Sequence, residues 1–86
     1  MRMFLTTKNW KEGHHYIAYT PELDLASQGK TPEHAEKRLR EAAALFIEET
    51  KRMGTLNEIL EKTGFVKKQR HWEAPRISIS SVEIPA

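Results

Sequence analysis

Two carboxylates that stand two residues apart are the first pair in this sequence able to do chemistry. Glu22 and Asp24 follow Pro21, and paired carboxylates can divide the roles of general acid and base between them. Proline favours a turn at this point, however, and acidic side chains in turns most often bind the neighbouring backbone. We therefore predict that both carboxylates shape a turn, and we assign no catalytic residue.

The four histidines are the next candidates, as metal ligands. His14 and His15 are adjacent, so in a strand their side chains point to opposite faces and cannot chelate one ion. His34 and His71 stand alone, the chain has no cysteine, and no acidic residue joins a histidine at metal-ligand spacing. We predict no metal site and no cofactor.

Nucleophilic and phosphate-binding motifs are also missing from the sequence. The serines, Ser27 among them, lack the surroundings of a nucleophile elbow. Gly29 and Gly64 belong to no phosphate-binding glycine pattern. The sequence therefore predicts a protein that is not an enzyme.

One segment, residues 67–76, combines cations with an aromatic ring. Its charged and aromatic residues are Lys67, Lys68, Arg70, Trp72, Glu73 and Arg76. Such a mixture suits nucleic-acid backbones and stacked bases, with Lys67, Lys68 and Arg70 as the contacts. Tryptophan and arginine are also enriched at protein interfaces, and a tryptophan can equally pack in a core. We favour protein contact or core packing, and the alternative is a nucleic-acid-binding or oligomeric adaptor module.

A strand-turn-strand-helix unit must position all of these side chains. The predicted strands are residues 3–7, 15–20, 25–28 and 76–84. Residues 8–14 are polar and include a glycine, so we predict a loop there. The second strand has apolar or aromatic groups on both faces, so either face could be the buried one. The last strand changes phase at Ser80, which suggests a bulge, and we expect it to return to the sheet.

A long helix follows the third strand. Thr31 is a good N-cap, Pro32 suits the first helical position, and Gly54 ends the helix. Its apolar arc approaches about 200°, since Leu45 and Ile47 extend the core stripe on either side. One sheet face does not cover so wide an arc, so a second helix or a second subunit should cover the remainder. We expect a homo-oligomer, either a dimer or a tetramer.

A second, short helix is predicted after Gly54. Thr55 and Glu58 have the spacing of a capping box. Gly64 ends this helix, and Phe65 is placed for the apolar contact that accompanies such an end.

The predicted fold is α+β, a two-layer β-β-β-α-(α)-β sandwich in which a long helix crosses an antiparallel meander. Eighty-six residues suit a single domain, 1–86, and we expect no separate DNA-binding domain. The absence of cysteine agrees with a reducing compartment. No stretch has the length and apolar character of a signal peptide or a membrane span. We therefore expect a cytoplasmic protein without a membrane partner.

The central unit resembles the HicB-like antitoxin family. The resemblance rests on the turn after the second strand, the end of the third strand and the start and body of the long helix. These are Pro21-Glu22-Leu23, Ser27-Gln28-Gly29, Thr31 with Glu33 and Ala35, and Glu41-Ala42 with Leu45. The family is similar to a truncated RNase H fold that lacks the catalytic carboxylates of that enzyme.

The resemblance implies an antitoxin of a type II toxin-antitoxin system. Such a protein binds and neutralises a HicA-like mRNA-cleaving toxin through protein–protein contact. Our candidate residues for a partner or oligomer interface are Leu45, Ile47, Arg70, Trp72 and Arg76.

Overall fold

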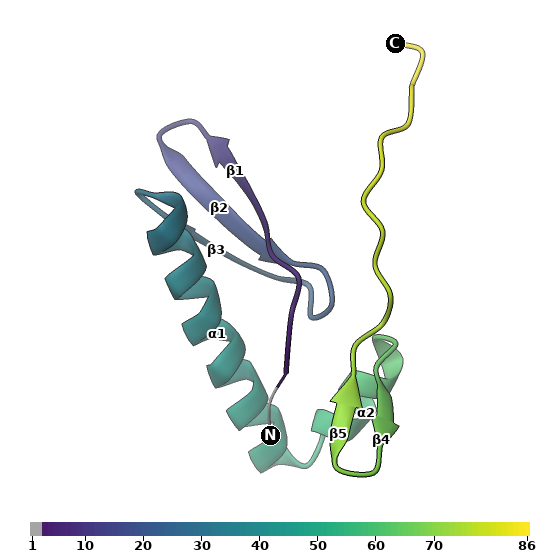
Figure 1. The fold of residues 1–86 in the computed structure, drawn as a ribbon. Coiled ribbons are helices and arrows are strands. Elements are labelled where there is room, and N and C mark those ends of the chain that lie inside the picture. The colour runs from purple at the N-terminus through teal and green to yellow at the C-terminus, as the bar shows by residue number, and fades with distance from the viewer. Residues whose placement is uncertain (1–2) are drawn as a thin grey trace.

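The structure is a computed structural model that describes residues 3–86 (Figure 1). Residues 1 and 2 of the predicted domain 1–86 lie outside this range. The elements are β1 (Lys8–Glu12), β2 (His15–Thr20), β3 (Leu25–Gly29), α1 (Pro32–Met53), α2 (Leu56–Lys62), β4 (Val66–Lys68) and β5 (His71–Glu73). The predicted α+β class and its β-β-β-α-α-β order are confirmed, with a hairpin as the last β element instead of a single strand.

The three-stranded sheet is an antiparallel meander in the order β1-β2-β3. The prediction of a first strand at residues 3–7 and a loop at 8–14 was wrong, because β1 lies inside the predicted loop. Gly13 has a left-handed φ of +63°, which allows a tight turn directly between β1 and β2. Every residue of β1 is exposed, and its polar composition follows from that exposure.

Helix α1 begins and ends where the sequence predicts. The Thr31 hydroxyl accepts a hydrogen bond from the backbone N–H of His34 at 3.0 Å, Pro32 stands in the first turn, and Gly54 ends the helix with a φ of 77°. The helix packs mainly against β3 and β2 and contacts β1 little. Ala18 of β2 and Leu39 of α1 are buried between the two layers.

The approach of α1 to the sheet is closest at Gly29, the last residue of β3. A Cβ atom there would lie 2.6 Å from the backbone nitrogen of Ala35 and 2.9 Å from the carbonyl carbon of His34. Only hydrogen fits in so narrow a gap. This glycine therefore sets the distance between the sheet and the start of the helix.

A second core joins α2 and the β4–β5 hairpin to the turn between β2 and β3. Its buried residues are Leu23, Leu56, Leu60, Phe65 and Trp72. The predicted end of α2 is confirmed, because Gly64 has a φ of 95° and the Phe65 N–H donates to the Leu60 carbonyl at 2.9 Å. The Phe65 ring is then buried against Leu60 and its neighbours, as the capping pattern indicates.

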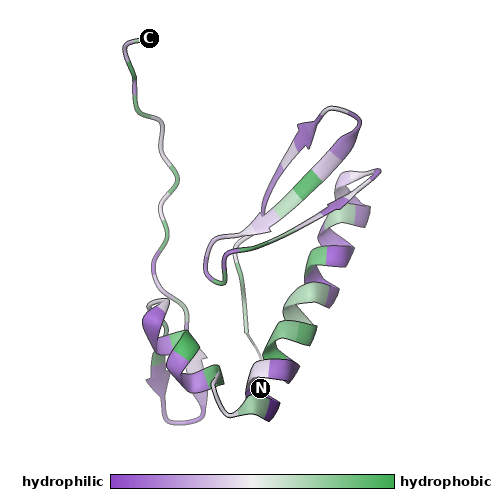
Figure 2. Cartoon of the chain, turned by 180° about the vertical axis from the view of Figure 1, so that it is seen from behind, coloured by the Kyte–Doolittle hydropathy of each residue, from purple (hydrophilic) through white to green (hydrophobic). Residues whose placement is uncertain are grey.

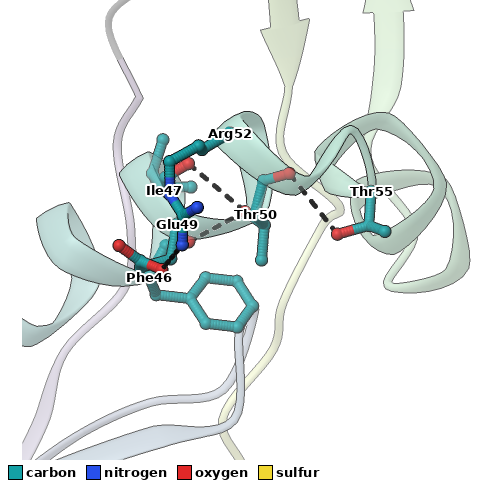
Figure 3. Close-up of polar contacts among 6 residues, drawn as sticks. All are labelled: Phe46, Ile47, Glu49, Thr50, Arg52 and Thr55. Carbon is teal, nitrogen blue, oxygen red and sulfur yellow. Dashed lines mark hydrogen bonds and ion pairs between the residues drawn. The ribbon is translucent and has the colours of Figure 1, made fainter.

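The junction between α1 and α2 differs from the predicted capping box. Thr55 makes no side-chain capping bond to α2, because its hydroxyl donates to the carbonyl of Thr50 at 3.4 Å (Figure 3). The Thr50 hydroxyl in turn donates to the carbonyl oxygens of Phe46 at 2.8 Å and Ile47 at 3.3 Å. The two threonines thus bind the last turn of α1, and they link it to the start of α2.

The segment after α2 is divided differently from the prediction. Residues 66–73, which show no clear periodicity, form the β4–β5 hairpin. Residues 76–84, predicted as a strand of the sheet, are extended but belong to no sheet in the described chain. A strand needs a neighbour for its backbone hydrogen bonds, and both views show this segment standing apart from the meander (Figures 1 and 2).

Neither described helix combines the length and the apolar character that crossing a bilayer requires.

Candidate interaction surface

The carboxylates Glu22 and Asp24 lie in the turn between β2 and β3 and make separate hydrogen bonds. Glu22 is buried and accepts from the backbone N–H of Thr6 at 2.8 Å and from the hydroxyl of Thr20 at 3.0 Å. Asp24 is exposed and accepts from the hydroxyl of Tyr19 at 2.9 Å. The bonds from Thr20 and Tyr19 are local, as predicted for carboxylates that shape a turn, whereas the bond from Thr6 comes from outside the turn.

Glu22 attaches the extended segment 3–7 to the sheet. Burial raises the pKa of its carboxyl, but the hydrogen bonds from Thr6, from the backbone of Glu22 and from Thr20 outweigh burial, and the pKa lies below the ordinary value of 4.5. A lowered pKa in the folded state means that the ionised carboxylate stabilises the fold. This contribution is present above the ordinary pKa and is lost as the pH falls through the folded-state value.

We expect Glu22→Gln to lower the free energy of unfolding by about 1–2 kcal/mol at pH 7, because charged acceptors form the stronger hydrogen bonds. The difference between the variant and the wild type should shrink as the pH falls from 5 to 3. Urea denaturation across this range measures it, with the exposed Glu61→Gln as the matched control. A difference that stays constant down to pH 3 would contradict the role of the ionised carboxylate.

The face of the meander that points away from α1 carries aromatic and apolar side chains. Ala18 and Thr20 are buried towards α1, so Ile17 and Tyr19 point the other way. The strand register places Trp10 directly opposite Ile17, and Trp10 is 44% exposed. We call Trp10, Ile17 and Tyr19 the open sheet face, since no helix of the described chain packs on this side.

Polar residues surround the open sheet face. Lys8 pairs with Tyr19 across the strands, and Gln28 pairs with Ile17. The pKa of the Tyr19 hydroxyl is raised, mainly by its hydrogen bond to Asp24 and to a smaller extent by burial and by the negative charge of Asp24. The hydroxyl therefore stays a neutral donor at physiological pH. An apolar centre with a polar rim is the usual arrangement of a protein–protein interface.

Sequence reasoning missed Trp10 because it placed residues 8–14 in a loop. A signal was nevertheless present, since Gly13 could make a tight turn that brings Trp10 and Ile17 together across a hairpin. The alternation of β2 shows two possible faces, and only the position of α1 decides which of them is open.

The structure separates most of the residues predicted for a partner or oligomer interface. Leu45 is 59% exposed on the outer side of α1, whereas Ile47 is half-buried against the second core. Trp72 lies in that same core with 8% exposure, so it packs within the chain. Arg70 is exposed in the turn of the hairpin, and Arg76 is exposed at the start of the extended tail.

The predicted nucleic-acid contacts lie together on the β4–β5 hairpin. Lys67, Lys68 and Arg70 are exposed, and the Lys67 ammonium lies 5.8 Å from the centre of the Trp72 ring. The burial of Trp72 removes the stacking platform that the sequence pattern suggested. The exposed cations can still contact phosphates.

Among residues 3–86, no three histidine, cysteine, aspartate or glutamate side chains gather closely enough to hold a metal ion.

No protein-family model matches the chain, and neither a curated protein nor a solved structure shows significant similarity to it. The fold and the open sheet face thus describe a small α+β protein with an exposed apolar surface, and the HicB-like resemblance stays a prediction from the residues.

Proposed function

We propose that this chain is a cytoplasmic antitoxin of the HicB-like kind, which binds a HicA-like mRNA-cleaving toxin through protein–protein contact and neutralises it. The open sheet face is the observation that supports this proposal most directly. Trp10 is 44% exposed and lies on β1 directly opposite Ile17 of β2, and an exposed tryptophan held in a sheet is the kind of anchor that carries binding energy in protein interfaces.

The arrangement of the elements supports the same proposal. The turn at Pro21, the close approach at Gly29 and the cap at Thr31 carry the family resemblance. Pro21 lies in the turn between β2 and β3, whereas Gly29 and Thr31 lie where α1 begins against the sheet. With α1 on one side, the other side of the sheet is left for a partner. Binding there would bring the toxin against strands that the two hairpin turns already hold in place.

The direct test is co-purification with the product of the adjacent gene and, where that product is a HicA-like RNase, an RNA-cleavage assay at increasing ratios of the two proteins. We expect Trp10→Thr to raise the Kd for the toxin at least tenfold and to weaken the inhibition of cleavage equally. Threonine suits a strand, so the sheet should be retained, and circular dichroism checks this.

Leu45→Thr is the matched control, because Leu45 is also an exposed apolar residue but lies on the outer side of α1. It should leave the affinity within twofold of the wild type. A loss of affinity with Leu45→Thr and not with Trp10→Thr would move the contact to α1. An adjacent HicA-like RNase that does not bind this chain would refute the antitoxin role.

A further inference from the structure

The extended tail, residues 76–84, has the pattern of a β-strand but no partner strand in the described chain. Its apolar residues Ile77, Ile79, Val82 and Ile84 are 38% to 77% exposed, and Figure 2 shows hydrophobic and hydrophilic stretches following one another along the tail. Polar residues alternate with the first two, as in a strand with one buried face. The tail also extends the molecule, whose radius of gyration is 14.8 Å, against roughly 12 Å for a compact chain of this length.

The outer edge of β1 is an acceptor for such a strand. β1 lies at one side of the sheet and pairs only with β2 among the described strands. Residues 3–7 lead into β1 as an extended segment outside any sheet. Together, residues 3–7 and β1 offer an edge of ten residues, which is roughly 33 Å long at about 3.3 Å per residue. The nine residues of the tail span roughly 30 Å when extended, so the two lengths match.

A groove of about 700 Å³ lies beside this edge, between residues 3–7 and α1. Leu5, Leu39, Ala43 and Ile47 give it an apolar lining. The groove exists because α1 packs over β3 and β2 and contacts β1 little. A strand added beside β1 would complete the layer under α1, and every second side chain of that strand would enter the groove.

The tail of the same chain stands away from this groove. Pro75 packs against Gly64, where an added Cβ would lie 3.1 Å from the Pro75 Cβ, and this contact sets where the tail begins. Figures 1 and 2 both place the meander between α1 and the tail. In both views β1 is the strand of the meander nearest the tail, and a space separates the two. Each chain therefore carries both a donor strand and an acceptor edge, which two copies can exchange reciprocally around a two-fold axis.

We propose that two copies of this chain form a dimer by exchanging their tails, with residues 76–84 of each copy pairing with the outer edge of β1 in the other. Ile77 and Ile79 enter the groove, and Ser78 points away from it. The added strand also covers the free edge of β1, which would otherwise invite non-specific pairing. This inference does not depend on the identity of a toxin, since the purified chain alone tests it.

Light scattering and analytical ultracentrifugation at micromolar concentration measure the dimer directly. Ile79→Asp places a charge on the strand face that enters the groove, and Ser78→Asp places the same charge on the opposite face. We expect Ile79→Asp to raise the dimer Kd at least 30-fold and Ser78→Asp to change it less than threefold. Ile79 is 69% exposed in the single chain, so the substitution should leave the fold of each copy intact.

A second pair of variants tests the acceptor. Ala44 is exposed and lines the groove, so Ala44→Arg should block it, whereas Leu45→Arg on the outer side of α1 should not. Mixing is decisive, because an Ile79→Asp copy keeps an open groove and an Ala44→Arg copy keeps an intact tail. Each variant alone should be monomeric, and the mixture should form a one-to-one heterodimer through a single exchanged strand.

The other outcomes overturn the proposal. A monomeric wild type would mean that the tail folds back on its own chain or stays free. A dimer that survives Ile79→Asp, or that Leu45→Arg breaks and Ala44→Arg does not, would place the interface on α1. Two monomeric variants that fail to form a heterodimer would rule out exchange.

Discussion

Replacing Gly29 by alanine is expected to lower the free energy of unfolding by about 3 kcal/mol, the upper end for an overpacked site. The added Cβ would lie 2.6 Å from the backbone nitrogen of Ala35 and 2.9 Å from the carbonyl carbon of His34. Both are backbone atoms of the first turn of α1, so no side chain can rotate away. Relief requires the helix to move off β3, which would expose Ala18 and Leu39 in the layer between them.

Thermal and urea denaturation measure this loss, and for a chain of this size 3 kcal/mol corresponds to a fall in Tm of roughly 12–24 °C. Gly54→Ala is the informative comparison. A Cβ on Gly54 meets nothing within 4 Å, but its φ of 77° is strained for alanine, which costs about 1 kcal/mol. If Gly29→Ala were no more destabilising than Gly54→Ala, the close approach of α1 to the sheet would be wrong.

Truncating Leu60 to alanine is expected to cost about 3–4 kcal/mol. Leu60 is fully buried and lies among Leu56, Phe65 and Trp72, so its removal leaves a cavity in addition to the lost burial of the side chain. α2 has seven residues and is too short to be stable without its packing. We expect the loss of Leu60 to loosen α2 and the β4–β5 hairpin together.

Urea denaturation followed by Trp72 fluorescence measures this effect, in a Trp10→Phe background that leaves one tryptophan. Leu45→Ala is the matched control, because the same substitution is made at a helical leucine that is 59% exposed. It should change the free energy of unfolding by less than about 0.5 kcal/mol. A Leu60→Ala variant as stable as Leu45→Ala would mean that α2 does not pack on the second core.

These two sites also separate folding from binding. Gly29 and Leu60 support the two cores, whereas Trp10 and Ile79 are exposed in the single chain. Substitutions of the exposed pair should therefore change association without a large loss of stability. Residues of a binding surface would then change the Kd for association, whereas residues of the core would change the free energy of unfolding.

The ends of the helices could be predicted because their signals are local. Thr31, Pro32 and Gly54 act through their own backbone geometry and the nearest turn, so their effect does not depend on distant packing. Gly64 and Phe65 end α2 in the same way. The capping box at Thr55 was the exception, since its hydroxyl binds Thr50 across the junction of two helices.

The candidate site could be predicted only in part. Arg70 and Arg76 are exposed as an interface would require, but Trp72 is buried in the chain's own core. Composition alone treats a tryptophan beside cations as a binding element, because it carries no information about which side chains fill the core. Trp10, which lies on the open sheet face, was assigned to a loop and received no role.

By itself, the sequence determined the α+β class, the order of the elements and the limits of α1, since these depend on periodicity and on capping residues within a few positions. Only the tertiary structure decided which face of β2 is covered, where β1 lies, and that residues 76–84 have no partner strand in the described chain. The physical reason is that a strand is completed by its neighbours. Alternating side chains give a strand two faces, and its backbone has two edges. Long-range packing selects which of these α1, another strand or a second copy will cover.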